Sequence, residues 1–138
     1  MRQASARLEV ATKGKGLIDI SREVHAFVAR ERIGQGLLTV FCRHTSASLL
    51  IQENADPDVQ EDLKHFLETI APEGAGYVHD TEGADDMPAH IRAALTQTSL
   101  SIPIESSRLV LGTWQGIYLC EHRSAPHKRT IALHVMGE

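Results

Sequence analysis

Histidine dominates the reactive side chains of this sequence. The 138 residues contain eight histidines against four lysines, and imidazole both titrates near neutral pH and is the commonest metal ligand. His44, His79, His90 and His122 come from four separate parts of the chain, and each lies near a carboxylate, a hydroxyl or a tight turn. Three imidazoles with one open position would bind zinc or a similar divalent ion. No pair has a dedicated spacing such as H-E-x-x-H, so local hydrogen bonding by each histidine stays an alternative.

A group of acids, "EGADD", occupies Glu82 to Asp86 between two of these histidines. One aspartate before a helix is explained as an N-terminal cap. Three acids around a glycine turn that also carries His79 and His90 exceed what capping needs. Asp85 and Asp86 are therefore candidates for holding magnesium together with a phosphate, or for a general base.

Two further polar segments offer groups for binding a ligand. "HTSAS" starts at His44 and supplies three hydroxyls, but the nucleophile pattern G-x-S-x-G is absent, so we expect anion binding and not a nucleophilic serine. "LGTWQGIYLCEHR" contains Trp114, the single tryptophan, between two glycines. A lone tryptophan usually belongs to the core. Next to Gln115, Trp114 could instead form the stacking wall for a flat heterocycle.

The elements that position these groups alternate along the chain. Residues 4–10 alternate apolar and polar, which predicts a strand, and a short strand through Ile18 and Ile20 leads to Ser21, a good helix cap. Val24, Phe27 and Val28 mark one face of the helix that follows. The apolar run 36–42 predicts a central strand with 48–52 as its partner, so that "RHTSA" lies between the two.

The second helix has the clearest start in the sequence. Asp56 can cap it, Pro57 fits the first helical position, and an apolar face follows from Val59 to Ile70. A third helix is expected from about Pro88 to Leu95, capped by Asp85 or Asp86. Strands are then predicted at 99–105, 108–112, 115–121 and 128–135. This order predicts a single α+β domain over 1–138, with two or three helices and a largely antiparallel sheet folded over on itself like a sandwich.

Composition excludes several classes of function. The net charge of -4 and pI near 6.0 provide no basic surplus for nucleic acid. The N-terminus lacks a secretory apolar segment and no apolar run approaches the length of a membrane span, so we expect a cytoplasmic protein without a membrane partner. Cys42 and Cys120 lie in apolar surroundings, which suits buried, reduced thiols.

Taken together, the motifs resemble a known family. "TKGKGLIDI", "HTSASLLIQENADPDV", "EGADDMPAHIRAAL", "SIPI", "LGTWQGIYLCEHR" and "HKRTIALHVMG" are similar, in order and over nearly the whole chain, to the YjbQ-like family, also described as secondary thiamine-phosphate synthases. The resemblance implies an α+β fold, a homotrimer, and a pocket near the subunit boundaries. One departure is visible: the family usually has a glycine where this chain has Ser106-Ser107, and serine accepts a positive φ poorly.

The resemblance also implies a set of site residues at matching positions. The expected catalytic residues are His44, His79, His90, Asp86, Glu121 and His122. The expected substrate-binding residues are Thr45, Ser46, Ser48, Asn54, Trp114 and Gln115. Arg123 is added to them for its charge, which could neutralise a departing diphosphate. The expected metal ligands are His44, His79, His90, Asp85, Asp86 and His122, with magnesium or zinc as the ion.

The implied activity joins a pyrimidine diphosphate to a thiazole phosphate and releases diphosphate, as a weak or side activity. The pocket has few cations for two phosphorylated substrates, which favours metal assistance. Two alternatives remain open at this point. One is a different metal-dependent hydrolase or lyase, and the other is a non-catalytic protein that binds a small phosphorylated or heterocyclic metabolite.

Overall fold

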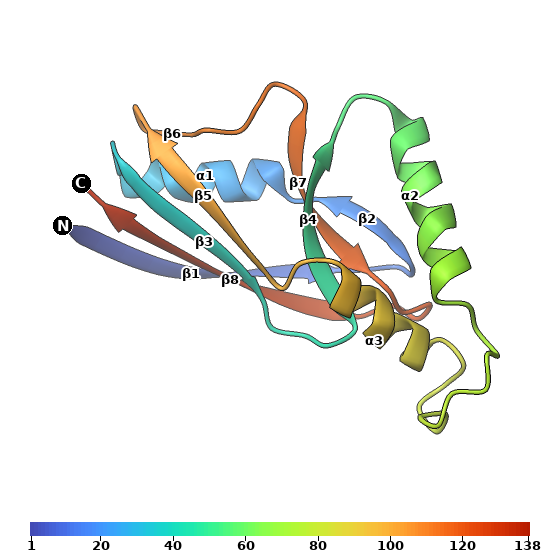
Figure 1. Ribbon diagram of the computed structural model, residues 1–138. Helices are drawn as coiled ribbons and strands as arrows, with labels where there is room; N and C mark the ends of the chain where they lie inside the picture. Colours follow the sequence, from blue (N-terminus) through green and yellow to red (C-terminus); the bar gives the residue numbers. More distant parts are fainter.

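Two antiparallel sheets form the body of the molecule. In the computed structural model, which describes all 138 residues, the first sheet has five strands and no parallel pair (Figure 1). Its order is β1 (Arg2–Ala11), β8 (Lys128–Gly137), β3 (Gly36–Cys42), β5 (Ser99–Glu105) and β6 (Arg108–Leu109). Alternating side chains of these strands, such as Leu38 and Val40 on β3, are fully buried, as expected for strands with one face on the core.

The second sheet has three strands and carries most of the polar segments of interest. Its order is β2 (Gly16–Asp19), β7 (Gln115–Glu121) and β4 (Ala47–Glu53). The expected pairing of 48–52 with 36–42 is therefore wrong, since β4 pairs with β7 along its whole length. Both edges of β3 are already occupied by β5 and β8. The chain between β3 and β4 consequently leaves the first sheet and enters the second.

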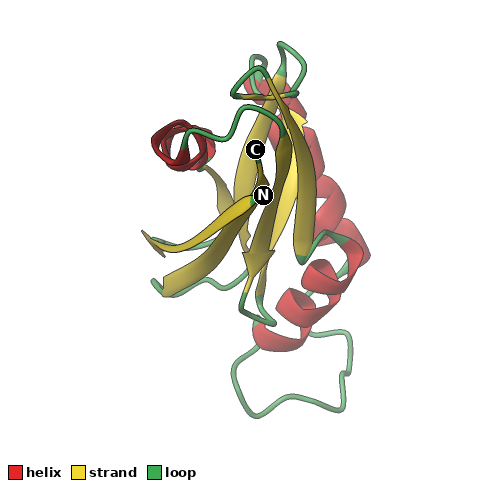
Figure 2. Ribbon diagram, turned by 90° about the vertical axis from the view of Figure 1, so that its left-hand side faces the viewer, coloured by secondary structure: helices red, strands yellow, loops and turns green.

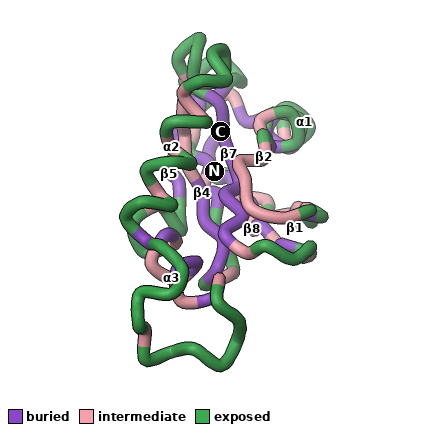
Figure 3. Tube along the Cα trace, turned by 90° about the vertical axis from the view of Figure 1, so that its right-hand side faces the viewer, coloured by how far each residue is buried: buried purple, intermediate pink, exposed green.

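Three helices cover the sheets from opposite sides (Figures 2 and 3). α1 (Ser21–Glu31) lies on one side and buries Val24, Phe27 and Val28. α2 (Pro57–Ile70) and α3 (Asp86–Leu95) lie on the other side. The predicted α+β class, with its antiparallel folded sheet and single domain, is what the structure shows.

α2 begins as predicted but does not enter the core. Asp56 caps it by accepting a hydrogen bond from the Asp58 N–H at 2.9 Å, and Pro57 takes the first position. No residue of α2 is buried, and Phe66 and Ile70 are about half exposed. Its apolar face instead lies over a cavity between the helix and the second sheet.

Ser106 and Ser107 adopt the conformation that glycine usually takes. They form the two-residue turn between β5 and β6, and their φ values are 50° and 64°. Positive φ at both positions is the signature of a type I′ hairpin turn. The departure from the family pattern therefore changes the residue type and keeps the turn, while β6 ends at Leu109, earlier than the predicted 112.

The two cysteines are free and buried, as expected. No helix has the length and apolar character needed to cross a bilayer.

Candidate functional site

Three of the predicted residues converge beside α3. The Nε2 atom of His79 lies 2.7 Å from Oδ2 of Asp86, and Nε2 of His90 lies 3.2 Å from the same oxygen. One ligand atom from each of these residues falls within 4.8 Å of the other two. We call His79, Asp86 and His90 the α3 cluster.

Local structure explains how the α3 cluster forms. Asp86 is the first residue of α3 and His90 lies one turn later, so both occupy the same face of the helix. His79 comes from the largely exposed segment between α2 and α3, which projects beyond the sheets in Figure 3 and folds back toward the helix start. The side chain of Asp86 is buried, whereas those of His79 and His90 are 45% and 31% exposed. The cluster is therefore open to solvent on its histidine side.

Arg123 fixes the acidic side of the cluster. It lies two residues after the end of β7. Its Nη1 donates to Asp86 Oδ1 at 2.6 Å, and its Nε donates to Asp85 Oδ2 at 3.0 Å. Nη2 donates to the Glu82 carbonyl at 2.9 Å. This use of the guanidinium leaves the expected substrate-binding role of Arg123 with few free donors.

The surroundings keep both aspartates ionised. Burial alone would raise the pKa of Asp86, but hydrogen bonding from His79 and the charges of His90 and Arg123 bring that pKa below its ordinary value. Burial likewise opposes ionisation of Asp85, and the Ser124 N–H together with Arg123 lowers its pKa. Neither carboxylate caps α3 through its side chain, because both are engaged in these contacts.

The Thr45 carbonyl fixes which ring nitrogen of neutral His90 carries the proton. Nδ1 lies 2.9 Å from the Thr45 carbonyl oxygen, which can only accept, so Nδ1 must carry a proton. In neutral His90 the lone pair is then on Nε2 and faces the Asp86 carboxylate. Nε2 of His90 and Oδ2 of Asp86, 3.2 Å apart, are therefore placed so that both could bind the same cation.

The structure leaves His44 and His122 outside the α3 cluster. Nε2 of His44 accepts a hydrogen bond from the Thr130 N–H at 2.8 Å, so that lone pair is already used. Burial and the nearby Arg129 charge lower the pKa of His44. Thr45 contributes its carbonyl to His90 and no side-chain contact to the cluster.

His122 belongs to a separate buried group. Its Nε2 lies 2.8 Å from Ser48 Oγ, and Ser48 also contacts Thr96. Burial is the main reason that the pKa of His122 falls to about 4, with the Arg92 charge contributing in the same direction. His122 is therefore neutral near pH 7.

Glu121 forms a closed ion pair in the interior. Its carboxylate accepts from Arg129 Nε at 2.8 Å and from Thr12 Oγ1 at 2.7 Å, and Arg129 also donates to Ser46 Oγ at 3.0 Å. Burial would raise the pKa of Glu121, but these donors lower it. With its side chain fully enclosed and its oxygens occupied, Glu121 has a structural environment. Ser46 is also buried and bonded to Arg129, so its environment is structural as well.

The predicted residues Asn54, Trp114 and Gln115 lie at the far end of the second sheet. Gln115 and Glu121 are the two ends of β7, so about 20 Å of strand separates Gln115 from the His122 end. Gln115 Oε1 accepts from the Gly112 N–H, which closes the local turn. Trp114 is 62% exposed, so it belongs neither to the core nor to a pocket shared with the cluster.

Sequence reasoning missed Arg92. It lies on α3 and is 4% exposed, yet no carboxylate pairs with it. The signal was an arginine within the otherwise apolar stretch "HIRAAL". Thr12 and Thr96 were missed as well, because their partners Glu121 and Ser48 lie far away along the chain. Arg129 was missed although Glu121 precedes it by only eight residues.

Comparison with known proteins identifies the family. Residues 6–138 match the family described as "UPF0047 protein YjbQ-like". The chain is 56% identical to a UPF0047 protein of Synechocystis over 99% of this chain and 94% of the relative. The chain belongs to the YjbQ family. It is also 40% identical to the YjbQ protein of Escherichia coli O157:H7, over 95% of this chain and 96% of that protein.

Solved structures of the YjbQ family share the fold. A yjbq/upf0047 family protein from Clostridium acetobutylicum superposes with a TM-score of 0.84 at 38% identity, covering 94% of this chain and 99% of that one. A protein from Sulfolobus solfataricus P2, described as YbjQ-like and of unknown function, gives a TM-score of 0.88 at 21% identity, covering 99% and 100%.

The comparisons overturn the activity that the resemblance implied. The relatives carry family designations, and none of their names includes a thiamine-phosphate synthase activity. The assignment of this chain as a synthase joining a pyrimidine diphosphate to a thiazole phosphate was therefore wrong. Family membership was right, and the activity attached to it was not supported.

Proposed function

We propose that this YjbQ-family protein is a metal-dependent hydrolase whose metal ion is held by the α3 cluster. One observation carries the proposal: two imidazole nitrogens and one carboxylate oxygen lie within 4.8 Å of one another, and the second nitrogen of one imidazole is fixed by a carbonyl. Two histidines and one carboxylate are the ligands of several catalytic zinc sites, which keep the fourth position for water.

The donor set favours zinc over magnesium. Imidazole nitrogen suits zinc and its transition-metal neighbours, whereas magnesium prefers oxygen ligands and retained water. When bound, a zinc ion lowers the pKa of its water to about 7 and so supplies a hydroxide nucleophile at neutral pH.

The chain's own residues would orient and expose this site. Thr45 holds His90 in the tautomer whose Nε2 is free to bind, and Arg123 holds Asp86 by the oxygen that does not face the histidines. The exposed sides of His79 and His90 leave room for a small substrate. Asp85 would not bind the metal ion itself, and its role is to hold Arg123 in position.

A zinc titration with matched variants tests the metal site. We expect one zinc ion per chain by calorimetry, and a loss of affinity of about 10- to 100-fold or more in His90→Ala and Asp86→Asn. His25→Ala removes an exposed histidine of α1 and is the matched control, with unchanged affinity. Equal zinc binding by His90→Ala and His25→Ala would refute the site.

Hydrolysis separates an enzyme from a binding protein. Zinc-loaded protein should cleave members of a panel of nitrophenyl esters and phosphate esters, and activity should disappear with chelator and in His79→Ala. Zinc binding at the cluster without turnover of any panel member would favour the non-catalytic alternative. That result would confirm the metal site and refute the hydrolase assignment.

The homotrimer stays a prediction. The half-exposed apolar side chains of Phe66 and Ile70 on α2 are the kind of surface that a subunit contact covers. Sedimentation equilibrium should give about three times the 15.2 kDa chain mass. A mass equal to one chain would refute it.

A further inference from the structure

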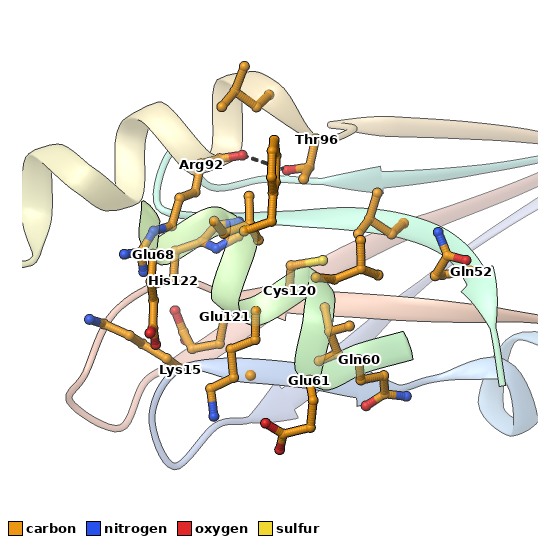
Figure 4. A pocket seen from close by; sticks show the side chains of 18 of the residues that line it. Lys15, Gln52, Gln60, Glu61, Glu68, Arg92, Thr96, Cys120, Glu121 and His122 are labelled. Atoms are coloured by element: carbon orange, nitrogen blue, oxygen red, sulfur yellow. Dashed lines mark hydrogen bonds between the residues drawn. The ribbon is translucent and has the colours of Figure 1, made fainter. Parts of the chain in front are cut away.

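The cavity beneath α2 has the size of a small-molecule site. It measures about 490 Å³ and lies between α2, the second sheet and the C-terminal half of α3 (Figure 4). Ligand pockets in proteins commonly fall between about 300 and 1,000 Å³ and have mainly apolar walls. The apolar lining here consists of Leu17, Leu50, Leu63, Phe66, Leu67, Leu95 and Cys120.

Arg92 provides the cavity with an unpaired buried charge. The guanidinium makes one hydrogen bond, from Nη2 to the Ala71 carbonyl at 3.0 Å, and no acid lies within ion-pair distance. Its Nε is the single buried side-chain polar atom of the chain that has no hydrogen-bond partner. Buried arginines are normally paired, as Arg129 is with Glu121. Arg92 therefore lacks an anion.

The other charged groups of the cavity do not supply that anion. Glu121 is saturated by Arg129 and Thr12, and Lys15 pairs with Glu73 at 3.1 Å. Glu61, Lys64 and Glu68 lie on the exposed rim formed by α2, and none pairs with Arg92.

His122 adds a neutral hydrogen-bonding group beside Arg92. In Figure 4 the Arg92 side chain extends from α3 toward His122 at one end of the cavity, and Gln52 lies toward the other end. Ser48 Oγ lies 2.8 Å from Nε2 of His122, which leaves the other ring nitrogen, Nδ1, for a further hydrogen bond. Because the imidazole is neutral near pH 7, Arg92 is the buried charge at this end of the cavity that has no counter-ion.

We propose that this cavity binds a small organic carboxylate with an elongated apolar body, its carboxylate on Arg92 and His122. A planar guanidinium matches a carboxylate in geometry, and one cation balances a monoanion better than a doubly charged phosphate. From Ser48 to Gln52 the floor strand β4 covers about 13 Å, which suits a medium-length chain lying along the apolar wall.

The site is separate from the α3 cluster. Arg92 follows His90 by two residues, which turns it about 200° around the helix. The two groups therefore point to different sides of α3, and the carboxylate site does not depend on the metal proposal.

Calorimetric titration of the full chain with a matched series of probes tests the proposal. The probes are butyrate, hexanoate, octanoate, 1-octanol and inorganic phosphate. We expect affinity to rise from butyrate to octanoate, and octanoate to bind about tenfold or more tightly than 1-octanol or phosphate. Equal affinity for 1-octanol and octanoate would overturn the proposal. So would the absence of binding heat from every carboxylate at millimolar concentration.

Two variants and a control locate the binding. Arg92→Gln should weaken octanoate at least about tenfold, and Leu63→Trp should block it by filling the cavity while Arg92 stays in place. Arg30→Gln removes an exposed arginine of α1 and should leave affinity unchanged. Octanoate affinity that stays at the wild-type value in both Arg92→Gln and Leu63→Trp would also overturn the proposal.

Urea unfolding of Arg92→Gln distinguishes a ligand site from a structural arginine. Without ligand, loss of an uncompensated buried charge should leave the unfolding midpoint unchanged or higher, since binding sites are often kept at the expense of stability. A markedly lower midpoint, with octanoate affinity retained by the folded fraction, would assign Arg92 to tying α3 to α2.

Discussion

The Glu121–Arg129 pair and the α3 cluster are both built from acids and bases, and they differ in how completely their polar atoms are used. Glu121 has Arg129 and Thr12 on its oxygens and no exposure. In the α3 cluster one carboxylate oxygen faces two imidazoles that remain partly open to solvent. Polar groups whose atoms are all hydrogen-bonded inside the protein therefore stabilise the fold, whereas groups with solvent-exposed polar atoms can still bind a ligand. In the sequence both kinds look like polar motifs.

The largest effect on the free energy of unfolding is expected when the Glu121–Arg129 ion pair is broken. Glu121→Gln leaves the Arg129 charge buried without its counter-ion, which costs about 3 to 5 kcal/mol of the free energy of unfolding. Urea denaturation measures this loss. Glu121→Met combined with Arg129→Met removes both charges and should recover most of the stability. If the single variant loses less than the double variant, the pair does not stabilise the fold as described.

A somewhat smaller effect should follow from titration of His122. Its pKa is about 4 in the folded protein and 6.5 in the unfolded chain, so the unfolded state binds more protons between these values. The contribution of neutral His122 to the free energy of unfolding should therefore be complete above pH 6.5. It should be lost as the pH drops toward 4, by up to about 3 kcal/mol. Denaturation midpoints across this range in wild type and His122→Gln measure the difference. Identical pH profiles would show that His122 is not buried as a neutral ring.

The smallest effect concerns the Ser106-Ser107 turn. Both serines hold positive φ, which asparagine and glycine adopt more readily. Replacing the pair by Asn-Gly should raise the free energy of unfolding by about 1 kcal/mol, because strain in the turn is relieved. Thermal denaturation measures the gain. A loss of stability would mean that the turn is not of type I′.

Local chemistry was readable from the sequence, and long-range contacts were not. Asp56 and Pro57 define the start of α2 through neighbouring atoms, so this boundary was predicted correctly. The pairing of β4 with β7 depends on which strand edges the other strands leave free, and no local pattern encodes that.

The site divides in the same way. The four-residue spacing of Asp86 and His90 on α3 makes their convergence foreseeable. Which of the distant histidines would join them was not foreseeable. It depends on how the segment between α2 and α3 folds back and on Arg123, which lies just after β7. The unpaired charge of Arg92 could be recognised only once its surroundings were known.

The most direct test of the open cluster is anomalous diffraction at the zinc edge from crystals grown with zinc. We predict one strong peak per chain, about 2.0 to 2.2 Å from Nε2 of His79, Nε2 of His90 and a carboxylate oxygen of Asp86. No peak is expected at Glu121 or at His122. A cluster without zinc, or zinc held by other residues while His79 and His90 still contact Asp86, would contradict the account.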